Sequence, residues 1–161
     1  ARSETANSPG LLLEPGWRFG SVANQFPDVQ DLGVDHLEDL LADHEPDVTV
    51  AVGVPEDWGH DSDTHIEVAF DGTPTTRAAF GGVLMSADGT LRIVVRAQTT
   101  AEAKRIALLC QGLLIGSTGH GITAIRPGVG VQPARDPQTN AELAGFTVLA
   151  TVRAQLIPAG S

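Results

Sequence analysis

Residues 90–119 read "TLRIVVRAQTTAEAKRIALLCQGLLIGSTG" and place a strand directly before a helix. The opening residues alternate between apolar and polar side chains, which is the period of a half-buried strand. Thr99 can cap the helix that follows, and Glu102, three residues later, completes a capping box. The helix carries one continuous apolar face and ends at Gly116 or Gly119. The stretch therefore predicts a strand joined to a helix that covers a sheet.

The other periodic segments complete the outline of a domain. Apolar residues at helical spacing predict a helix that ends before Pro46, since the residue before a proline disfavours helix. Asp88 and Gly89 lie between two alternating runs and predict a hairpin turn, because Asp-Gly is a strong hairpin signal. The remaining expected elements are a helix at 34–44, strands at 48–54, 64–70, 78–85, 122–131 and 145–157, and a polar loop at 132–144.

The order of these elements predicts the fold class. One helix, four strands, a second helix and two strands, mostly joined by hairpins, indicate an α+β fold. We expect a mostly antiparallel sheet with the two main helices on one face. Residues 1–31 are expected to form an extended N-terminal arm, and residues 32–161 a single domain. The arm contains Trp17 and Phe19, so it either folds back over its own domain or reaches a neighbouring subunit.

Composition excludes several classes of function. The chain has 161 residues, 20 acidic against 10 basic, and a formal net charge of −10. Tight binding to nucleic acid is not expected, because phosphates are bound through Lys and Arg. Cys110 is the single cysteine, which excludes an internal disulfide, and its place on an apolar helix face predicts an inert side chain. The sequence shows neither a leader peptide nor a run long enough to span a bilayer, so we expect an intracellular product with no membrane partner.

The segment "GHDSDTHIE" at 59–67 raises the question of a metal site. On a strand, Asp61, Asp63, His65 and Glu67 would project to one side, and such mixed sets can hold a transition metal. This leaves a small metal-dependent hydrolase that uses Asp61, Asp63 and His65 as an alternative function. That row contains one histidine, however, and a strand with one buried face normally has polar residues outward. The prediction is therefore no metal site and no cofactor.

No other pattern predicts catalysis. The chain has no nucleophile elbow and no phosphate-binding loop, so we expect a protein that is not an enzyme. The final strand is long, about twelve residues against a usual five or six. Arg126 and Arg153 stand within expected strands, and Asp136 lies in the loop between them. With the apolar arm these features favour an assembly protein whose candidate contacts are Trp17, Phe19, Arg126, Asp136 and Arg153.

Several segments together resemble the tail terminator proteins of long non-contractile-tailed bacteriophages, with a composition that suits an actinobacterial host. They are "HLEDLLADHEPDVTVAVGVP", "RIVVRAQTTAEAKRIALLCQGLL" and "RPGVGVQPARDPQTNAELAGFTVLATVRAQL". The closing segment is the most informative, because an Asp-Pro-x-Thr turn precedes a strand of the form apolar-T-V-x-A-x-V-R. The resemblance covers roughly residues 32–157 and transfers no catalytic or ligand residues by position.

The resemblance implies a virion structural protein in the tail and neck, assembled in the host cytoplasm. Subunits of this family form a ring, expected to be hexameric, that ends polymerisation of the tail tube and meets the neck proteins of the head. The implied partners are copies of the chain, the tail tube protein and a head-side connector, with genomic DNA passing the lumen without specific binding. Another neck or minor tail component, such as a head-closure protein, is the alternative within this class.

Overall fold

The computed structural model describes residues 22–25, 28–59, 63–78, 84–137 and 139–158. It divides into two units, one made of residues 1–25 and 155–161 and the other of residues 26–154. The second unit holds both helices and a six-stranded sheet.

The predicted strand and helix at 90–119 are both present. Strand β5 (Leu84–Ala97) leads into helix α3 (Thr100–Leu114). The Thr99 hydroxyl accepts a hydrogen bond from the Glu102 backbone N–H at 3.1 Å, which satisfies one of the unpaired donors of the first turn. Beyond Leu114 the chain leaves the helix, and Gly116 takes a φ of +82° that favours glycine.

Helix α2 (Val29–Leu41) begins five residues earlier than the sequence pattern predicts. Its start is fixed by Asp28, whose carboxylate accepts hydrogen bonds from the backbone N–H groups of Gln30 at 2.9 Å and Asp31 at 3.4 Å. The buried stripe of the helix consists of Val29, Gly33, His36, Leu37 and Leu41.

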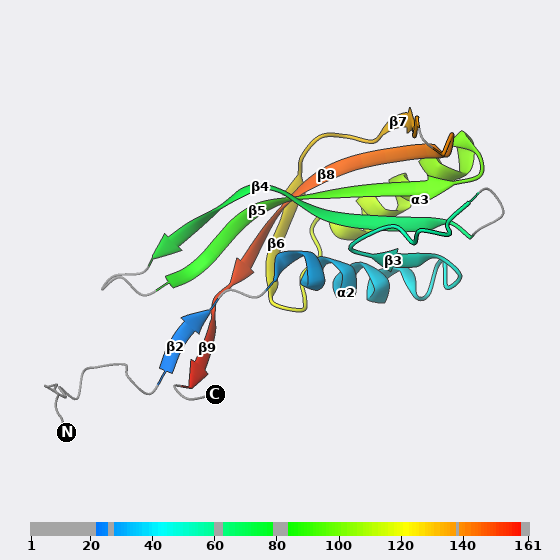
Figure 1. Cartoon of the computed structure of the whole chain (residues 1–161). Coiled ribbons are helices and arrows are strands. Elements are labelled where there is room, and N and C mark those ends of the chain that lie inside the picture. The colour runs from blue at the N-terminus through cyan, green and yellow to red at the C-terminus, as the bar shows by residue number, and fades with distance from the viewer. Residues whose placement is uncertain (1–21, 26–27, 60–62, 79–83, 138, 159–161) are drawn as a thin grey trace, which may run out of the picture. The chain divides into compact units, whose positions relative to one another are not determined.

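The sheet of this unit is mixed but mostly antiparallel (Figure 1). Its strands lie in the order β3, β4, β5, β8, β6, and β7 also pairs with β8. Only β3 and β4 run parallel among these described pairs. The bounds are β3 (Thr49–Ala51), β4 (His65–Ala78), β6 (Ile122–Pro127), β7 (Gln132–Arg135) and β8 (Glu142–Arg153).

Both helices cover one face of this sheet (Figure 1), as α3 packs on β5 and β8 while α2 packs on β3, β4 and β5. Alternate residues of the strands are buried under them, which is the period expected of a sheet with one covered face. The α+β class with two helices on one face is therefore confirmed. The largest fully buried side chains include Phe146, Leu37, Leu41, Ile66, Leu91, Ile93, Ile106 and Leu114.

The predicted Asp-Gly hairpin turn is wrong. Asp88 and Gly89 lie inside β5, and the change of direction between β4 and β5 falls in residues 79–83, outside the described residues. A Cβ added at Gly89 would come within 2.3 Å of the Phe70 ring, so the glycine lets that ring lie over the strand. The Asp88 carboxylate accepts a hydrogen bond from the Thr151 hydroxyl at 2.5 Å. Asp88 and Gly89 therefore make contacts with the neighbouring strands β8 and β4 and do not form a turn.

The C-terminal strands also differ from the prediction. Residues 132–135, expected within a polar loop, form β7, which pairs with the beginning of β8. The long strand exists, with 12 residues, but it covers Glu142–Arg153 instead of 145–157. β8 pairs with β5 along its whole length, while β7 and β6 share its other edge. The last strand of the unit, β8, therefore pairs with three other strands of the sheet.

In the other unit, strand β2 (Val22–Gln25) pairs antiparallel with strand β9 (Gln155–Pro158). Residues 1–21 of the predicted arm, including Trp17 and Phe19, lie outside the described residues. In the described part of the chain, neither helix has the length and apolar character needed to cross a membrane.

Candidate functional site

The histidine of the predicted metal cluster is engaged in the fold. His65 is buried, with a relative exposure of 2%. Its Nε2–H donates to the Gly53 carbonyl at 2.6 Å, and its Nδ1 accepts from the Thr49 hydroxyl at 2.7 Å. Both ring nitrogens of a neutral imidazole are therefore used to fasten β3 and the loop after it to β4. Asp63 is exposed, and Asp61 lies outside the described residues.

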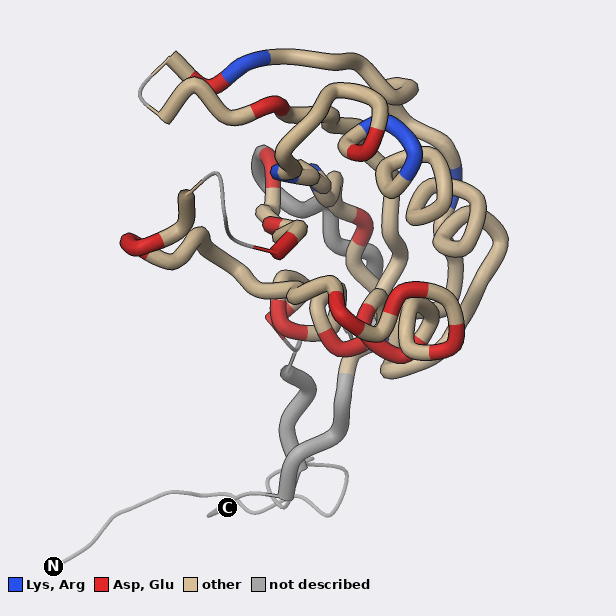
Figure 2. Tube along the Cα trace, turned by 90° about the vertical axis from the view of Figure 1, so that its right-hand side faces the viewer, with Lys and Arg blue, Asp and Glu red and all other residues tan. Residues whose placement is uncertain are grey.

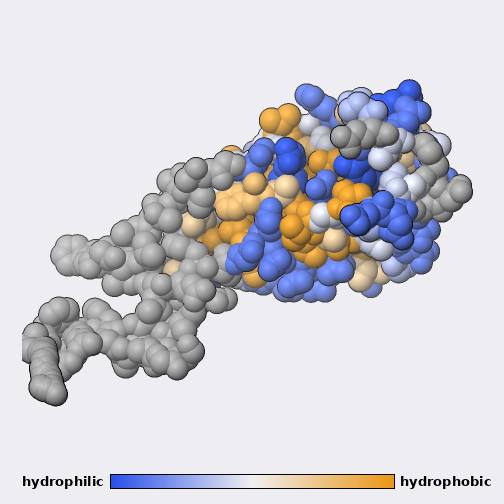
Figure 3. Space-filling model, in the orientation of Figure 1, coloured by the Kyte–Doolittle hydropathy of each residue, from blue (hydrophilic) through white to orange (hydrophobic). Residues whose placement is uncertain are grey.

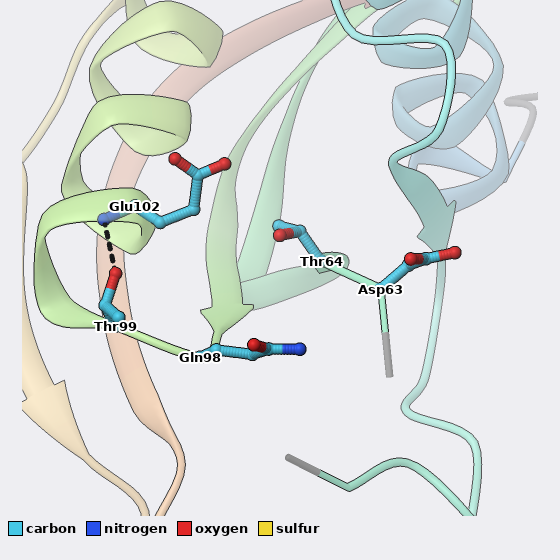
Figure 4. Close-up of a pocket in the computed structure, with 5 residues that line it drawn as sticks. All are labelled: Asp63, Thr64, Gln98, Thr99 and Glu102. Carbon is cyan, nitrogen blue, oxygen red and sulfur yellow. Dashed lines mark hydrogen bonds between the residues drawn. The ribbon is translucent and has the colours of Figure 1, made fainter. Parts of the chain in front are cut away.

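A polar pocket of about 320 Å³ lies beside this segment and is lined by Asp63, Thr64, Gln98, Thr99 and Glu102 (Figure 4). The Arg105 guanidinium donates two hydrogen bonds of 2.9 Å to the Glu102 carboxylate and so lowers its pKa. The Thr99 hydroxyl is occupied as the cap of α3. Across the described residues, no group of three or more histidine, cysteine or carboxylate side chains could hold a metal ion.

Cys110 is buried in α3, and burial raises the pKa of its thiol to about 12. A thiolate nucleophile is therefore disfavoured at this position, in line with the prediction of an inert side chain.

Asp136 serves a contact within the chain. Its carboxylate accepts a hydrogen bond from Arg96 Nη1 at 2.7 Å, and Arg96 also lies 3.9 Å from Glu67. This pair joins the turn after β7 to the C-terminal end of β5. The structure brings Asp136 to Arg96, and its role in assembly stays a prediction.

The sheet face opposite the helices, here called the outer face, carries the other two candidates. Arg126 and Leu149 are cross-strand partners and therefore project to the same side. Arg153 follows on β8 at the same parity. Both arginines are exposed, and neither has an ion-pair partner among the residues whose side chains are described.

Apolar side chains accompany these arginines. Leu149 is 36% exposed, and Val129, at 56%, lies beside the same strand because its backbone exchanges a hydrogen bond with Thr147. Figure 3 shows hydrophobic and hydrophilic residues intermixed on the side of the molecule that it draws. Exposed aliphatic side chains next to unpaired guanidinium groups are typical of protein contact surfaces.

Helix α2, on the other side of the sheet, has an acidic surface. Asp31, Asp35, Glu38 and Asp39 of α2 are exposed, and the helix carries no basic residue (Figure 2). These four side chains are called the acidic face below. The sequence holds a signal that pattern analysis missed, because fourteen of its twenty acidic residues and none of its ten Lys and Arg residues fall in 28–71.

Neither a protein-family model nor a curated protein matches the chain. Among solved structures, a chain of the "Virion of native gene transfer agent (GTA) particle" is similar, with a TM-score of 0.45 and 18% sequence identity. The similarity covers 71% of this chain and 84% of that chain. A similarity of this size bears on neither the family nor the function of the protein.

Proposed function

We propose that the chain is a virion structural protein that assembles into a ring at the head-proximal end of a phage tail tube. The ring ends polymerisation of the tube and offers its other side to a neck protein. Two features support this role. The order of elements resembles that of the tail terminator proteins, and the sequence Asp-Pro-x-Thr at 136–139 stands shortly before β8. In this proposal the protein is not an enzyme.

The observation that carries the proposal is the separation of charge between two sides of one unit. α2 lies on the covered side of the sheet and presents the acidic face, while Arg126 and Arg153 extend from the outer face. An acidic helix surface on one side and exposed arginines on the other favour a head-to-tail contact, in which the acidic face of one subunit meets Arg126 and Arg153 of the next. Such a contact closes into a ring when the rotation between subunits allows it.

Charged and apolar side chains contribute differently to this contact. An exposed ion pair contributes only about 0.2–1 kcal/mol, so the charges set the orientation and rate of encounter more than the affinity. Leu149 and Val129 supply apolar area that becomes buried.

The remaining partners follow from the proposed position. The tail tube protein and a head-side connector would meet the two rims of a ring expected to hold six subunits. DNA leaving the head would pass through the lumen, and a chain of net charge −10 would not bind its phosphates.

A direct test combines the purified full chain with polymerising tail tube protein. We expect the chain to cap tube ends and stop elongation, which electron microscopy measures as tube length. Particles that lack the protein should carry overlong tails. Tails of normal length detached from filled heads would assign the chain to head closure instead.

Charge reversal tests the proposed contact. We expect Arg126→Glu to slow and weaken ring formation, measured by native mass spectrometry of chain bound to tubes. Lys104→Glu, an equal change of charge on an exposed position of α3, should assemble normally. Adding Asp35→Arg to Arg126→Glu should restore part of the assembly. Equal loss in both single variants would contradict a contact through the outer face.

The hydrolase alternative has its own test. Purified protein should contain no stoichiometric transition metal, and Asp63→Ala should leave both the metal content and the assembly unchanged. Stoichiometric metal that is lost in this variant would favour the hydrolase over the virion structural role.

A further inference from the structure

Four side chains, two from α2 and two from the connection 115–121, form one continuous series of contacts. Asp39 Oδ2 lies 2.7 Å from His120 Nε2, and His120 Nδ1 lies 3.3 Å from His36 Nδ1. His36 Nε2 then lies 2.9 Å from the Ser117 hydroxyl, which donates to the Leu114 carbonyl at 2.6 Å.

Counting protons shows what this chain of contacts requires. The Ser117 hydroxyl donates to the Leu114 carbonyl, so His36 must donate its Nε2–H to the serine oxygen, and Asp39 accepts a hydrogen bond from the His120 Nε2–H. The remaining contact joins two Nδ1 atoms and is a hydrogen bond only when one of them carries a proton. All four contacts are satisfied together when the two imidazoles hold three ring protons, which is a single positive charge.

The contacts connect two elements. His36 and Asp39 belong to α2, whereas Ser117 and His120 belong to the connection 115–121 between α3 and β6. This connection is conformationally demanding, because His120 has a φ of +55° between Gly119 at +144° and Gly121 at +85°. A Cβ at Gly119 would come within 3.3 Å of the His36 ring, so the ring packs against this backbone.

We propose that His36 and His120 bind one proton between them, and that this proton fastens the connection 115–121 to α2. Loss of the proton leaves two lone pairs facing each other at the Nδ1 atoms. Uptake of a second proton places two N–H groups and two positive charges there. Either change releases the connection, so the contact is closed only within a band of pH.

The charged surroundings support a single proton. Burial lowers the pKa of His36, the nearby His120 lowers it further, and Asp39 raises it. A second proton is therefore resisted, while Asp39 favours the first. The other charged groups near the pair, Asp35 on α2 and Arg153 at the end of β8, are both exposed to solvent.

The connection reaches the proposed contact surface, since the Arg153 N–H donates to the Gly121 carbonyl at 3.0 Å. Release of the connection would loosen the end of β8. The inference itself rests on the geometry of the four side chains and stands without the proposed function.

Nitrogen NMR of the full chain tests the inference, with EDTA present because two imidazoles can also chelate a transition metal. We expect a pH range in which His120 carries two ring protons and His36 carries one, at Nε2. Two independent titrations with no such state would overturn the inference.

Hydrogen exchange provides the second measurement. Within that pH range, Asp39→Asn should accelerate exchange of the Gly119 and Ile122 amides by about two- to fivefold, because the Asp39 side chain is largely exposed and its ion pair is correspondingly weak. Asp35→Asn removes the same charge from the next turn of α2 and should leave exchange unchanged. His120→Asn, which keeps a residue tolerant of positive φ, should exchange as fast as Asp39→Asn at every pH. Equal exchange in Asp39→Asn and Asp35→Asn would refute the fastening role.

Discussion

Replacing Gly128 with alanine should destabilise the sheet at the edge of the outer face. A Cβ at Gly128 would lie 2.4 Å from the Thr147 Oγ1, 2.7 Å from its carbonyl oxygen and 2.9 Å from its carbonyl carbon. Backbone atoms of the central strand cannot turn aside as a side chain can. The chain at 128–129 must therefore move away from β8.

The size of the destabilisation can be worked out from the hydrogen bonds that this movement breaks. Gly128 N–H donates to the Thr147 carbonyl at 3.1 Å, Val129 N–H donates to the Thr147 hydroxyl at 2.7 Å, and Thr147 N–H donates to the Val129 carbonyl at 3.0 Å. Each bond contributes about 0.5–1.5 kcal/mol net, and overpacking typically costs about 1–3 kcal/mol. For a chain of this size, we expect Tm to fall by roughly 2–12 °C.

Thermal and urea unfolding of the variant measure this change. The matched control is Gly130→Ala, since nothing lies within 4 Å of a Cβ at that position. This control should be neutral, or more stable by about 0.4–1 kcal/mol, because alanine restricts the unfolded chain. If the two variants melt within about 1 °C of each other, the reasoning is refuted. Adding Thr147→Ala should not rescue Gly128→Ala, since the carbonyl contact remains.

Three further predictions concern buried groups. Cys110, whose thiol pKa is raised to about 12, should react with a thiol reagent only at the rate of unfolding; fast labelling of the native protein at pH 8 would contradict its burial. His65→Ala should lower the free energy of unfolding by about 1–3 kcal/mol, because the Gly53 carbonyl and Thr49 hydroxyl lose their partner; unchanged urea midpoints would refute this. The pKa of His36 is lowered from 6.5 in the folded protein, so the unfolded chain binds more protons below that pH. The contribution of His36 to the free energy of unfolding should therefore be complete above pH 6.5 and decrease as pH drops through the lowered pKa, by up to about 1.4 kcal/mol per pH unit for one proton, and His36→Gln should flatten this part of the profile.

The predictability of each element depends on how local its determinants are. Helix α3 was predicted almost to the residue, because its cap at Thr99 and its apolar period lie within the segment itself. The Asp88–Gly89 signal failed because the reason for the glycine is Phe70, on another strand. β7 was missed because "QPAR" has no alternation, and it forms through backbone pairing with a strand that follows it.

The functional sites show the same difference between features set by local sequence and features set by contacts between distant segments. The acidic character of α2 was missed although it could have been predicted, since it is a property of one continuous segment, 28–71, that holds no Lys or Arg. The contacts of His36 with Ser117 and His120 could not be predicted, because those residues are 81 and 84 positions apart and meet only after α2 and α3 pack. His65 was misleading for the opposite reason. Its acidic neighbours suggested a ligand set, but its two nitrogens are used by Thr49 and Gly53.

The position of β8 has a consequence for biosynthesis. Three strands, β5, β6 and β7, pair with Glu142–Arg153, and this is the last segment of its unit to leave the ribosome. At translation rates of about 5–20 residues per second, the earlier strands wait for several seconds with an open edge. A nascent chain stalled before Glu142 would expose the edge of β5 and the apolar side of α3 together. Chaperone binding should therefore peak on ribosomes that have not yet released this segment.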